Sequence, residues 1–355
     1  MKQFIYKSAL FLLPFVVLWG ITQIGYSTGE GDLSRLGYLT KDTPYWKQFI
    51  RNTPVYYDKI SELDTTKTMK YSVLTFGDSF SHFFANSNYV NYLAESDSVS
   101  VLNFTTPSSP SVFSDLSGFI NGDVFDKVSV DYVIVESGER YVISRIQTID
   151  KNWSIHLKDI VHPTEKKIIP SQHIKSILLY PFYLLMRSIA GEGRSLGSQC
   201  YQFTLTAPLF SGKRASDLFV YHEDIMLAHQ NTQEAVETFN EELNVFAALL
   251  AKKGIKLIVL PAANKYSVYY EFIQSKEKYL KPQFFELLKP LDKSYIYIDS
   301  HEILAKAAAQ GIKDLYFADD THWSPIGAKL IAEKLANDIK AQKLYKSGDC
   351  GSNLH

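Results

Sequence analysis

A buried strand that ends in Gly77, Asp78 and Ser79 is the feature that most constrains how this chain folds. Residues 73–76 are apolar or β-branched, which predicts a short strand buried on both faces. An apolar-rich segment at roughly helical spacing follows, so we expect a helix to begin at Ser79. A strand that turns directly into a helix presents the turn residue at the carboxyl edge of a sheet, where open α/β folds carry out their chemistry.

The hydroxyl group of Ser79 is the first candidate for chemistry at this edge. A serine in such a turn attacks a carbonyl carbon, while the backbone N–H groups that open the helix hold the resulting oxyanion. Gly77 lies beside these groups in the sequence. The competing interpretation is a Gly-Asp-Ser turn without a catalytic role. In both cases we expect Asp78 to bond the backbone of its own turn.

A second stretch, near the far end of the chain, supplies the base that such a serine requires. His322 follows Asp319 and Asp320, and Trp323 and a predicted helix come after it. A serine nucleophile needs an imidazole to take its proton and a carboxylate to orient that imidazole. Each residue alone also fits a structural role, the acids as helix caps and the histidine as a partly buried side chain. Together with Ser79 they predict a catalytic triad in which either acid orients the ring.

Strands separated by helices predict a doubly wound domain that carries these two stretches. We expect further strands at residues 98–104, 131–135, 255–260 and 295–298, and helices at residues 112–120, 232–253 and 325–339. The alternation predicts a three-layer α/β fold of the flavodoxin-like kind, with a central parallel sheet and right-handed crossovers. In such a sheet the loops that carry Ser79 and His322 meet over one edge.

Loops at the carboxyl ends of the other strands are the candidates for binding substrate and oxyanion. The loop at residues 105–110 either offers N–H groups as a second oxyanion donor or is a simple serine-rich turn. Arg140, after the third strand, either forms a structural ion pair or faces the substrate. The full set of oxyanion and substrate-binding candidates is Gly77, Thr106, Ser109, Arg140, Lys265 and Trp323.

The first 26 residues predict a membrane anchor. Lys2 and Lys7 precede an uncharged stretch at residues 8–26 that is long enough to span a bilayer. Positive charge before the span predicts a cytoplasmic N-terminus and an exported remainder. No clean cleavage site follows, which favours an uncleaved anchor over a signal peptide. We therefore expect a single-pass protein of the inner (cytoplasmic) membrane whose catalytic domain lies on the extracytoplasmic, periplasmic side.

The remaining segments differ in how much they predict. The chain divides into the anchor at 1–26, a juxtamembrane lead-in at 27–70, the main domain at 71–340 with an insertion at about 141–230, and a flexible tail at 341–355. The lead-in is polar and irregular, and we assign it no chemistry. Within the insertion, residues 173–190 fit a lid, a surface that rests on membrane, or a helix packed on the core. Residues 201–210 and 217–221 predict a hairpin.

Composition excludes one class of function and leaves one question open. The net charge is −1 and the chain has no basic stripe, so no nucleic-acid partner is expected. The histidines other than His322 show no ligand spacing, and we assign neither a metal nor a cofactor. Cys200 and Cys350 do not make a disulfide framework, and whether they pair is left open.

Short motifs give the chain a family resemblance. GDSF together with the late Asp-x-His resembles the SGNH (GDSL-like) hydrolase superfamily. FGDSF, the Glu139-Arg140 strand end, PAANKYSVYYEF and DDTHWSPIGA are similar to the alginate-type O-acetyltransferases (AlgJ/AlgX-like), as scattered motifs over residues 71–340. The resemblance implies a triad of Ser79, His322 and Asp320, whereas the general superfamily spacing implies Asp319 as the acid.

Two departures from the family limit what the resemblance implies. The serine precedes the histidine here, as in ordinary SGNH enzymes and the teichoic-acid D-alanyl transfer protein, whereas the alginate enzymes have the opposite order. The substrate is therefore not carried over. The superfamily's Gly-x-Asn-Asp block is also absent, since residues 136–139 read Glu-Ser-Gly-Glu. Thr106, Ser109 or Arg140 is then expected to replace the asparagine of the oxyanion hole.

The resemblance implies acyl transfer to a glycan. Such a protein O-acylates, usually O-acetylates, hydroxyls of a cell-surface or secreted polysaccharide through an acyl-serine intermediate. A membrane-bound O-acyltransferase (MBOAT) partner supplies the acyl group, and the insertion at 141–230 is our candidate for the element that excludes water. The alternatives are an esterase that removes acyl groups with the same triad, and a non-catalytic scaffold of a polysaccharide assembly complex.

Overall fold

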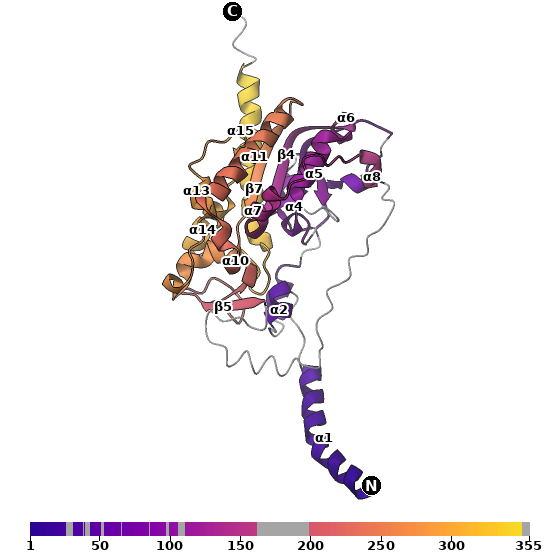
Figure 1. Cartoon of the computed structure of the whole chain (residues 1–355), viewed down its shortest axis with the longest axis vertical. Coiled ribbons are helices and arrows are strands. Elements are labelled where there is room, and N and C mark those ends of the chain that lie inside the picture. The colour runs from indigo at the N-terminus through magenta and orange to yellow at the C-terminus, as the bar shows by residue number, and fades with distance from the viewer. Residues whose placement is uncertain are drawn as a thin grey trace, which may run out of the picture.

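A parallel sheet forms the centre of the molecule, seen in a computed structural model (Figure 1). The structure describes residues 1–25, 31–37, 39, 43–50, 53–64, 66–84, 86–96, 99–105, 111–161 and 199–349. The sheet has six strands in the order β1-β3-β2-β4-β7-β8, and all neighbours run parallel. Its strands are β1 (Asp58–Lys59), β2 (Met69–Gly77), β3 (Val101–Thr105), β4 (Val128–Gly138), β7 (Lys256–Ala262) and β8 (Ile296–Tyr297).

The strand order explains why chemistry is expected after β2. Without the short edge strand β1, the order is that of a flavodoxin-like sheet, in which the first main strand lies between the second and the third. Chain direction reverses across the sheet at that first strand, and this switch point opens a crevice at the carboxyl edge. Ser79 follows β2 and therefore stands at the crevice.

Helices cover the two faces of the sheet, which confirms the predicted three-layer α/β class. On one face α4 (Tyr89–Glu95) packs against α15 (Pro325–Asp349), and α15 contacts α14 (Ser300–Ala309). On the other face α5 (Val112–Asn121), α7 (Glu139–Gln147) and α11 (Gln233–Ala251) pack together. The middle strands bury apolar side chains on both faces, as the sequence of residues 73–76 predicted.

The prediction that a helix begins at Ser79 is wrong. Ser79–Ser81 form only a single 3-10 turn, η2, and α4 begins at Tyr89. Phe84 adopts a left-handed backbone conformation with φ of 51°, which interrupts any helix, and the side chain of Asn88 caps α4 by accepting from Asn91 N. Because Ser79 does not begin an α-helix, the dipole of such a helix does not help to stabilise an oxyanion at this turn.

The lead-in is part of the domain and not a simple spacer. Its strand β1 pairs with β3, so the central sheet begins at Asp58 and not at the predicted Tyr71. Earlier in the lead-in, α2 (Asp32–Gly37) and α3 (Thr43–Lys47) lie against the loop that precedes α15. The sequence predicts that the lead-in packs on the domain, but its irregular, polar pattern gave no sign of β1 or of the particular residues in contact.

The region predicted as an insertion is more regular than expected. Helix α7 packs in the helical layer beside α11 and α5, so any insertion begins after it and not at residue 141. The predicted hairpin is confirmed: β5 (Cys200–Thr204) and β6 (Asp217–Tyr221) pair as an antiparallel two-stranded sheet. The apolar segment at 173–190 lies outside the described residues.

The remaining described elements are short and connect the layers. They are η1 (Ile60–Glu62), α6 (Val124–Lys127), α8 (Leu157–Val161), α10 (His222–Met226), η4 (Ala228–Gln230), α12 (Lys265–Tyr269), η5 (Tyr270–Phe272), η6 (Lys276–Lys278) and α13 (Phe284–Leu288).

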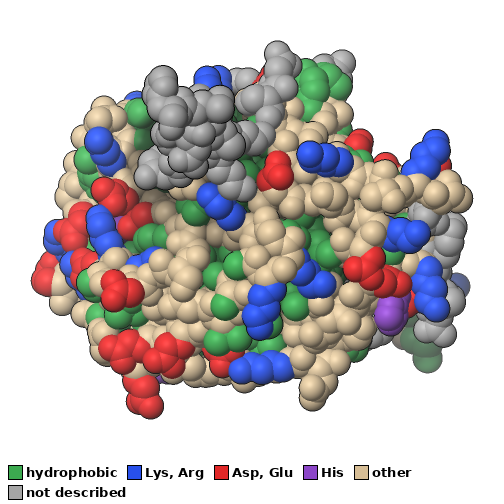
Figure 2. All heavy atoms as spheres, turned by 90° about the horizontal axis from the view of Figure 1, so that it is seen from above, with side chains coloured by type: hydrophobic (Ala, Val, Ile, Leu, Met, Phe, Trp, Pro, Cys, Tyr) green, Lys and Arg blue, Asp and Glu red, His purple; other side chains and the backbone are tan. Residues whose placement is uncertain are grey.

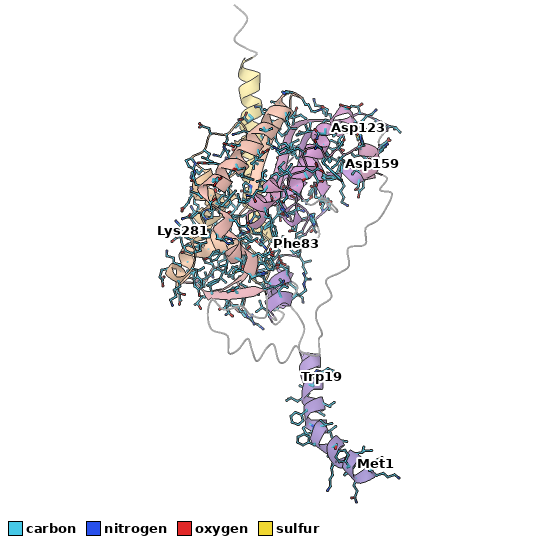
Figure 3. The ribbon with its side chains drawn as sticks, in the orientation of Figure 1. Met1, Trp19, Phe83, Asp123, Asp159 and Lys281 are labelled. Atoms are coloured by element: carbon cyan, nitrogen blue, oxygen red, sulfur yellow. The ribbon has the colours of Figure 1, made fainter. Side chains whose placement is uncertain are left out.

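The two ends of the chain are helical. Helix α1 (Lys2–Gly25) contains one apolar stretch, Lys2–Ile21, that is long enough to cross a membrane and is unburied. Figure 3 labels Trp19 on this helix. At the other end α15 continues to Asp349, whereas the sequence predicted a flexible tail from residue 341. Cys350 lies outside the described residues, so the pairing of Cys200 stays open.

The face shown in Figure 2 carries basic and acidic side chains interspersed over the helices, with no single-sign field. This mixture is what a net charge of −1 leads one to expect.

Gly77 offers a test of how tightly the end of β2 is packed. A Cβ at this position would lie 1.7 Å from Ser81 Oγ and 2.7 Å from Glu136 Oε2, so Gly77→Ala should lower the free energy of unfolding by about 1–3 kcal/mol. Gly138→Ala is the matched control, because its Cβ would meet Asp78 Oδ2 at an ordinary 3.5 Å. Chemical denaturation of both variants measures the difference, and equal stabilities would contradict the packing described here.

Candidate active site

Ser79, His322 and Asp320 form one hydrogen-bonded chain. Ser79 Oγ lies 2.6 Å from His322 Nε2, and His322 Nδ1 lies 2.6 Å from Asp320 Oδ1. Ser79 comes from the turn after β2, and the other two come from the loop between α14 and α15. The two loops predicted to meet over one sheet edge therefore do so. Nε2 faces the serine and Nδ1 faces the acid, which is the arrangement that a serine nucleophile, a base and an orienting acid require.

Of the two candidate acids, only Asp320 contacts the ring. It also accepts a hydrogen bond from the backbone N–H of His322, at 2.9 Å. Asp319 faces away and accepts hydrogen bonds from Ser34 Oγ and, at 3.2 Å, from Trp46 Nε1. Asp319 is therefore not the orienting acid, and the sequence could not separate the two because both lie within reach of one ring.

The electrostatics of the pair favour a charged imidazole. Burial alone would lower the pKa of His322, but the charge and hydrogen bond of Asp320, with smaller contributions from Asp32 and Asp78, raise the pKa above its ordinary 6.5. Burial also opposes ionisation of Asp320, yet the charge of His322 and its hydrogen bonds hold the pKa of that carboxyl below its ordinary value. The pair therefore stabilises the imidazolium that forms when the ring accepts a proton.

Aromatic rings enclose the imidazole. The ring of Phe83 stacks on that of His322, with centroids 4.2 Å apart and an angle of 12° between the planes. Phe80 approaches from a second direction, at 5.0 Å between centroids. Phe83, labelled in Figure 3, lies on the side of the domain nearest α2. Only 12% of the His322 side chain is exposed to solvent, so water reaches the base along few directions.

Asp78 braces the turn that carries the nucleophile. As predicted, its carboxylate bonds its own turn, accepting from Phe80 N at 3.3 Å. It also accepts from Gly138 N, at the end of β4, at 3.0 Å. With Arg145 of α7 it forms an ion pair at 2.6 Å. Burial would raise the pKa of Asp78, but Arg145 outweighs it and the pKa is lowered. This carboxylate thus ties the end of β2 to the end of β4.

Glu136 is a buried acid beneath the same turn; the sequence left open whether it joins a structural ion pair with Arg140 or faces the substrate. Its Oε2 accepts hydrogen bonds from Asp78 N at 3.0 Å and from Ser81 Oγ at 2.8 Å. Burial first, and then the charge of Asp78, raise the pKa of Glu136 well above its ordinary value. Glu136 lies within the strand and not after it, because β4 extends to Gly138 and does not end at Val135.

The backbone N–H of Ser79 is the available oxyanion donor. It has no hydrogen-bond partner in the described part of the chain, whereas Gly138 N is used by Asp78. Thr106 and Ser109, the other predicted donors, lie outside the described residues. Gly77 is fully enclosed against Ser81 and Glu136, which gives it a packing role at the end of β2.

Lys265 and Trp323, predicted to bind substrate, are buried in structural roles instead. Lys265 is fully buried and donates from Nζ to the carbonyls of Phe317 and Ala318, at 2.9 and 3.0 Å. Burial lowers its pKa to about 8, despite the nearby acids. Trp323 packs its ring on that of Phe80, 4.8 Å between centroids. Both residues contact the loop that carries His322 or the turn that carries Ser79.

Arg140 forms the structural ion pair that the sequence left as one of two alternatives. Its Nε lies 2.8 Å from Asp224 Oδ1, and both side chains are almost fully buried. Its guanidinium also lies 5.1 Å from the ring centroid of Tyr221, on the hairpin strand β6. The hairpin and α10 are thereby held against the start of α7.

The lead-in contributes a carboxylate that sequence reasoning missed. Asp32 lies with Asp320 and His322 so that one polar atom of each is within 4.8 Å of the others. Such a group has the spacing of metal ligands, but both ring nitrogens of His322 are already bonded, to Ser79 and Asp320. The arrangement therefore fits proton transfer. The polar, Gly-containing sequence around Asp32 gave no signal that it would reach the site.

The comparison with protein families agrees with this geometry. Residues 214–351 match the family described as SGNH hydrolase-like domain, acetyltransferase AlgX. The match includes Asp320, His322 and strands β7 and β8. It begins after Ser79, which is therefore not part of it. It confirms the predicted resemblance and supports an acyl-transferring or acyl-hydrolysing enzyme in general. No curated protein matches the chain.

The titration of His322 tests the assignment of the acid. Asp320→Asn removes the largest contribution that raises the pKa of His322, so this pKa should fall, as burial then dominates. Asp319→Asn should change it much less, because Asp319 bonds Ser34 and Trp46. NMR titration of the ring protons measures both values. A larger effect of Asp319→Asn would contradict the assignment.

Proposed function

We propose that this protein is an extracytoplasmic O-acyltransferase, specifically an O-acetyltransferase, that modifies hydroxyls of a cell-surface or secreted polysaccharide through an acyl-Ser79 intermediate. The observation that carries the proposal is the hydrogen-bonded chain Ser79–His322–Asp320 in a domain whose second half matches the AlgX acetyltransferase family. No other group of described residues combines a nucleophile, a base and an orienting acid at the switch point of the sheet.

The first half-reaction loads the serine. His322 Nε2 takes the proton of Ser79 Oγ as that oxygen bonds to the carbonyl carbon of the acyl donor. The negative charge that develops on the carbonyl oxygen is stabilised by the N–H of Ser79. The bond from the carbonyl carbon to the donor's leaving oxygen then breaks, and the proton on Nε2 passes to that oxygen. Asp320 keeps Nδ1 protonated throughout.

The second half-reaction transfers the acyl group from Ser79 to the acceptor. A hydroxyl of the polysaccharide gives its proton to His322 Nε2 while its oxygen attacks the carbonyl carbon of acyl-Ser79. When the bond to Oγ breaks, Oγ recovers the proton and the acylated glycan leaves. The two half-reactions share one base and one oxyanion site, so no cofactor is needed.

Enclosure of the base favours transfer over hydrolysis. An acyl-enzyme is hydrolysed whenever a water molecule reaches the base in place of the acceptor. Phe83 stacked on the imidazole, with Phe80 beside it, leaves an apolar surrounding that holds water poorly. Residues 162–198 of the insertion that the sequence suggested as the water-excluding element lie outside the described residues, whereas these rings are in the site itself.

An acyl donor at the membrane fits the position of α1. We propose that α1 anchors the domain, with the N-terminus in the cytoplasm, and that a membrane-bound O-acyltransferase (MBOAT) presents the acyl group to Ser79 on the other side. The apolar stretch Lys2–Ile21 and the positive charges Lys2 and Lys7 near its start support the anchor. The MBOAT partner is inferred from the family resemblance.

Ser79→Ala tests the mechanism. The full-length protein in detergent is incubated with a chromogenic acetate ester and an oligosaccharide acceptor, and mass spectrometry follows both acceptor and enzyme. The wild type should acetylate the oligosaccharide and carry acetyl on Ser79. The variant should lose at least about 10⁴-fold in turnover, because no nucleophile remains.

The control and the contrary outcomes separate the three functions. Ser72→Ala, in β2 but toward the end far from Ser79 and bonded to Ser100, should behave as wild type. Release of free acetate without an acetylated oligosaccharide would favour the esterase. Equal, background turnover in wild type and Ser79→Ala would leave only the non-catalytic scaffold.

A further inference from the structure

We propose that Asp32, in the segment that follows α1, is a positioning residue of the active site and holds Asp320 and His322 in place for proton transfer. This inference rests on the proposed function, because it assigns Asp32 a part in the same triad. The lead-in that contains Asp32 would then take part in catalysis by orienting Asp320 and His322.

The hydrogen bonds of Asp32 join it to the loop on both sides of the catalytic acid. Its backbone N–H donates to Asp320 Oδ2 at 2.8 Å, which occupies the carboxylate oxygen that does not face His322. Its own carboxylate accepts from Thr321 N at 2.9 Å and from Thr321 Oγ1 at 2.6 Å. Asp32 thus fixes the orientation of the Asp320 carboxylate and the backbone between Asp320 and His322.

The surrounding segment is packed on the same loop, which gives Asp32 a rigid base. Ser34 N donates to the carbonyl of Asp319 at 3.0 Å, and Tyr45 Oη accepts from Ala318 N at 2.7 Å. The ring of Trp46 stacks on that of Phe317, 4.5 Å between centroids. At Gly31 a Cβ would lie 2.1 Å from the carbonyl oxygen of Asp319, so only glycine allows this approach.

Charge gives Asp32 a second effect on the triad. The titratable groups that act on His322 are Asp320, Asp32, Asp78 and His82. The three carboxylates favour the imidazolium, and His82 opposes it. When His322 takes the proton of Ser79, it therefore becomes positive beside Asp32 as well as Asp320, and each negative charge lowers the energy of that state.

The connection to α1 limits where the site operates. Seven residue steps separate Gly25 from Asp32, so Asp32 lies at most about 25 Å from the end of α1, whatever path the chain takes. With α1 in a membrane, the triad that Asp32 contacts is held close to the membrane surface, within reach of a donor presented there.

Asp32→Asn is the test, because the amide keeps the shape and the acceptor oxygen for Thr321 N but removes the charge. We expect kcat to fall about tenfold with KM nearly unchanged, since the substrate does not contact Asp32. The pH at which kcat/KM reaches half its maximum should move down, as the pKa of His322 falls. Thermal unfolding should change little.

Asp299→Asn is the matched control, because the carboxylate of Asp299 also accepts from a backbone N–H, that of Glu302, but lies outside the triad. It should leave kcat and the pH profile unchanged. A wild-type kcat and pH profile in Asp32→Asn would overturn the proposal, as would a loss of thermal stability without either kinetic change.

A readout that does not depend on turnover separates this proposal from the proposed function. NMR titration should show a lower pKa of His322 in Asp32→Asn than in the wild type, with no acyl substrate present. If the wild type shows no transfer or hydrolysis but this shift is seen, the acyl chemistry fails while Asp32 still tunes His322. If turnover is present and the shift is absent, Asp32 is not a positioning residue.

Discussion

The hydrogen bond between Ser79 and His322 joins residues 243 positions apart, and the rest of the structure is arranged to make it possible. Each partner sits on a loop, and a loop alone would not hold two atoms at 2.6 Å. The sheet solves the first half of this problem. Because β2 is the strand at which the chain changes direction across the sheet, the turn after it opens toward the loop before α15. The bond is therefore a consequence of strand order.

Polar groups beneath each of the two loops hold Ser79 and His322 in position. Under Ser79, Asp78 and Glu136 bind the turn to β4, and Arg145 balances the charge. Under His322, Lys265 donates to two successive carbonyls from within the core. Burying these charges costs free energy, and that cost is offset only where each finds a partner. The site is thus held by polar groups that would weaken an ordinary core.

The lead-in changes how the anchor and the enzyme are related. The sequence predicts a juxtamembrane spacer that packs on the domain, and in the structure Gly31, Ser34 and Trp46 lie directly against the loop of Asp319 and Asp320. Anchor and active site are joined by a few residues instead of a long linker. For an enzyme proposed to receive its acyl group at a membrane, this short connection keeps the loaded serine near the donor and shortens the time in which water competes.

The sequence by itself determined the α/β class, the position of the main strands, and the pairing of Ser79 with His322, because apolar runs, turn residues and the two motifs are all local patterns. It also placed an acid next to the histidine. Only the tertiary structure decided that Asp320 and not Asp319 faces the ring, that Lys265 and Trp323 are buried, and that Asp32 reaches the site. These facts depend on which way a side chain points and on what packs against it from distant segments. Neighbouring acids carry the same local signal, so the choice between them is made by contacts with Ser34, Trp46 and Asp32, which no local pattern contains.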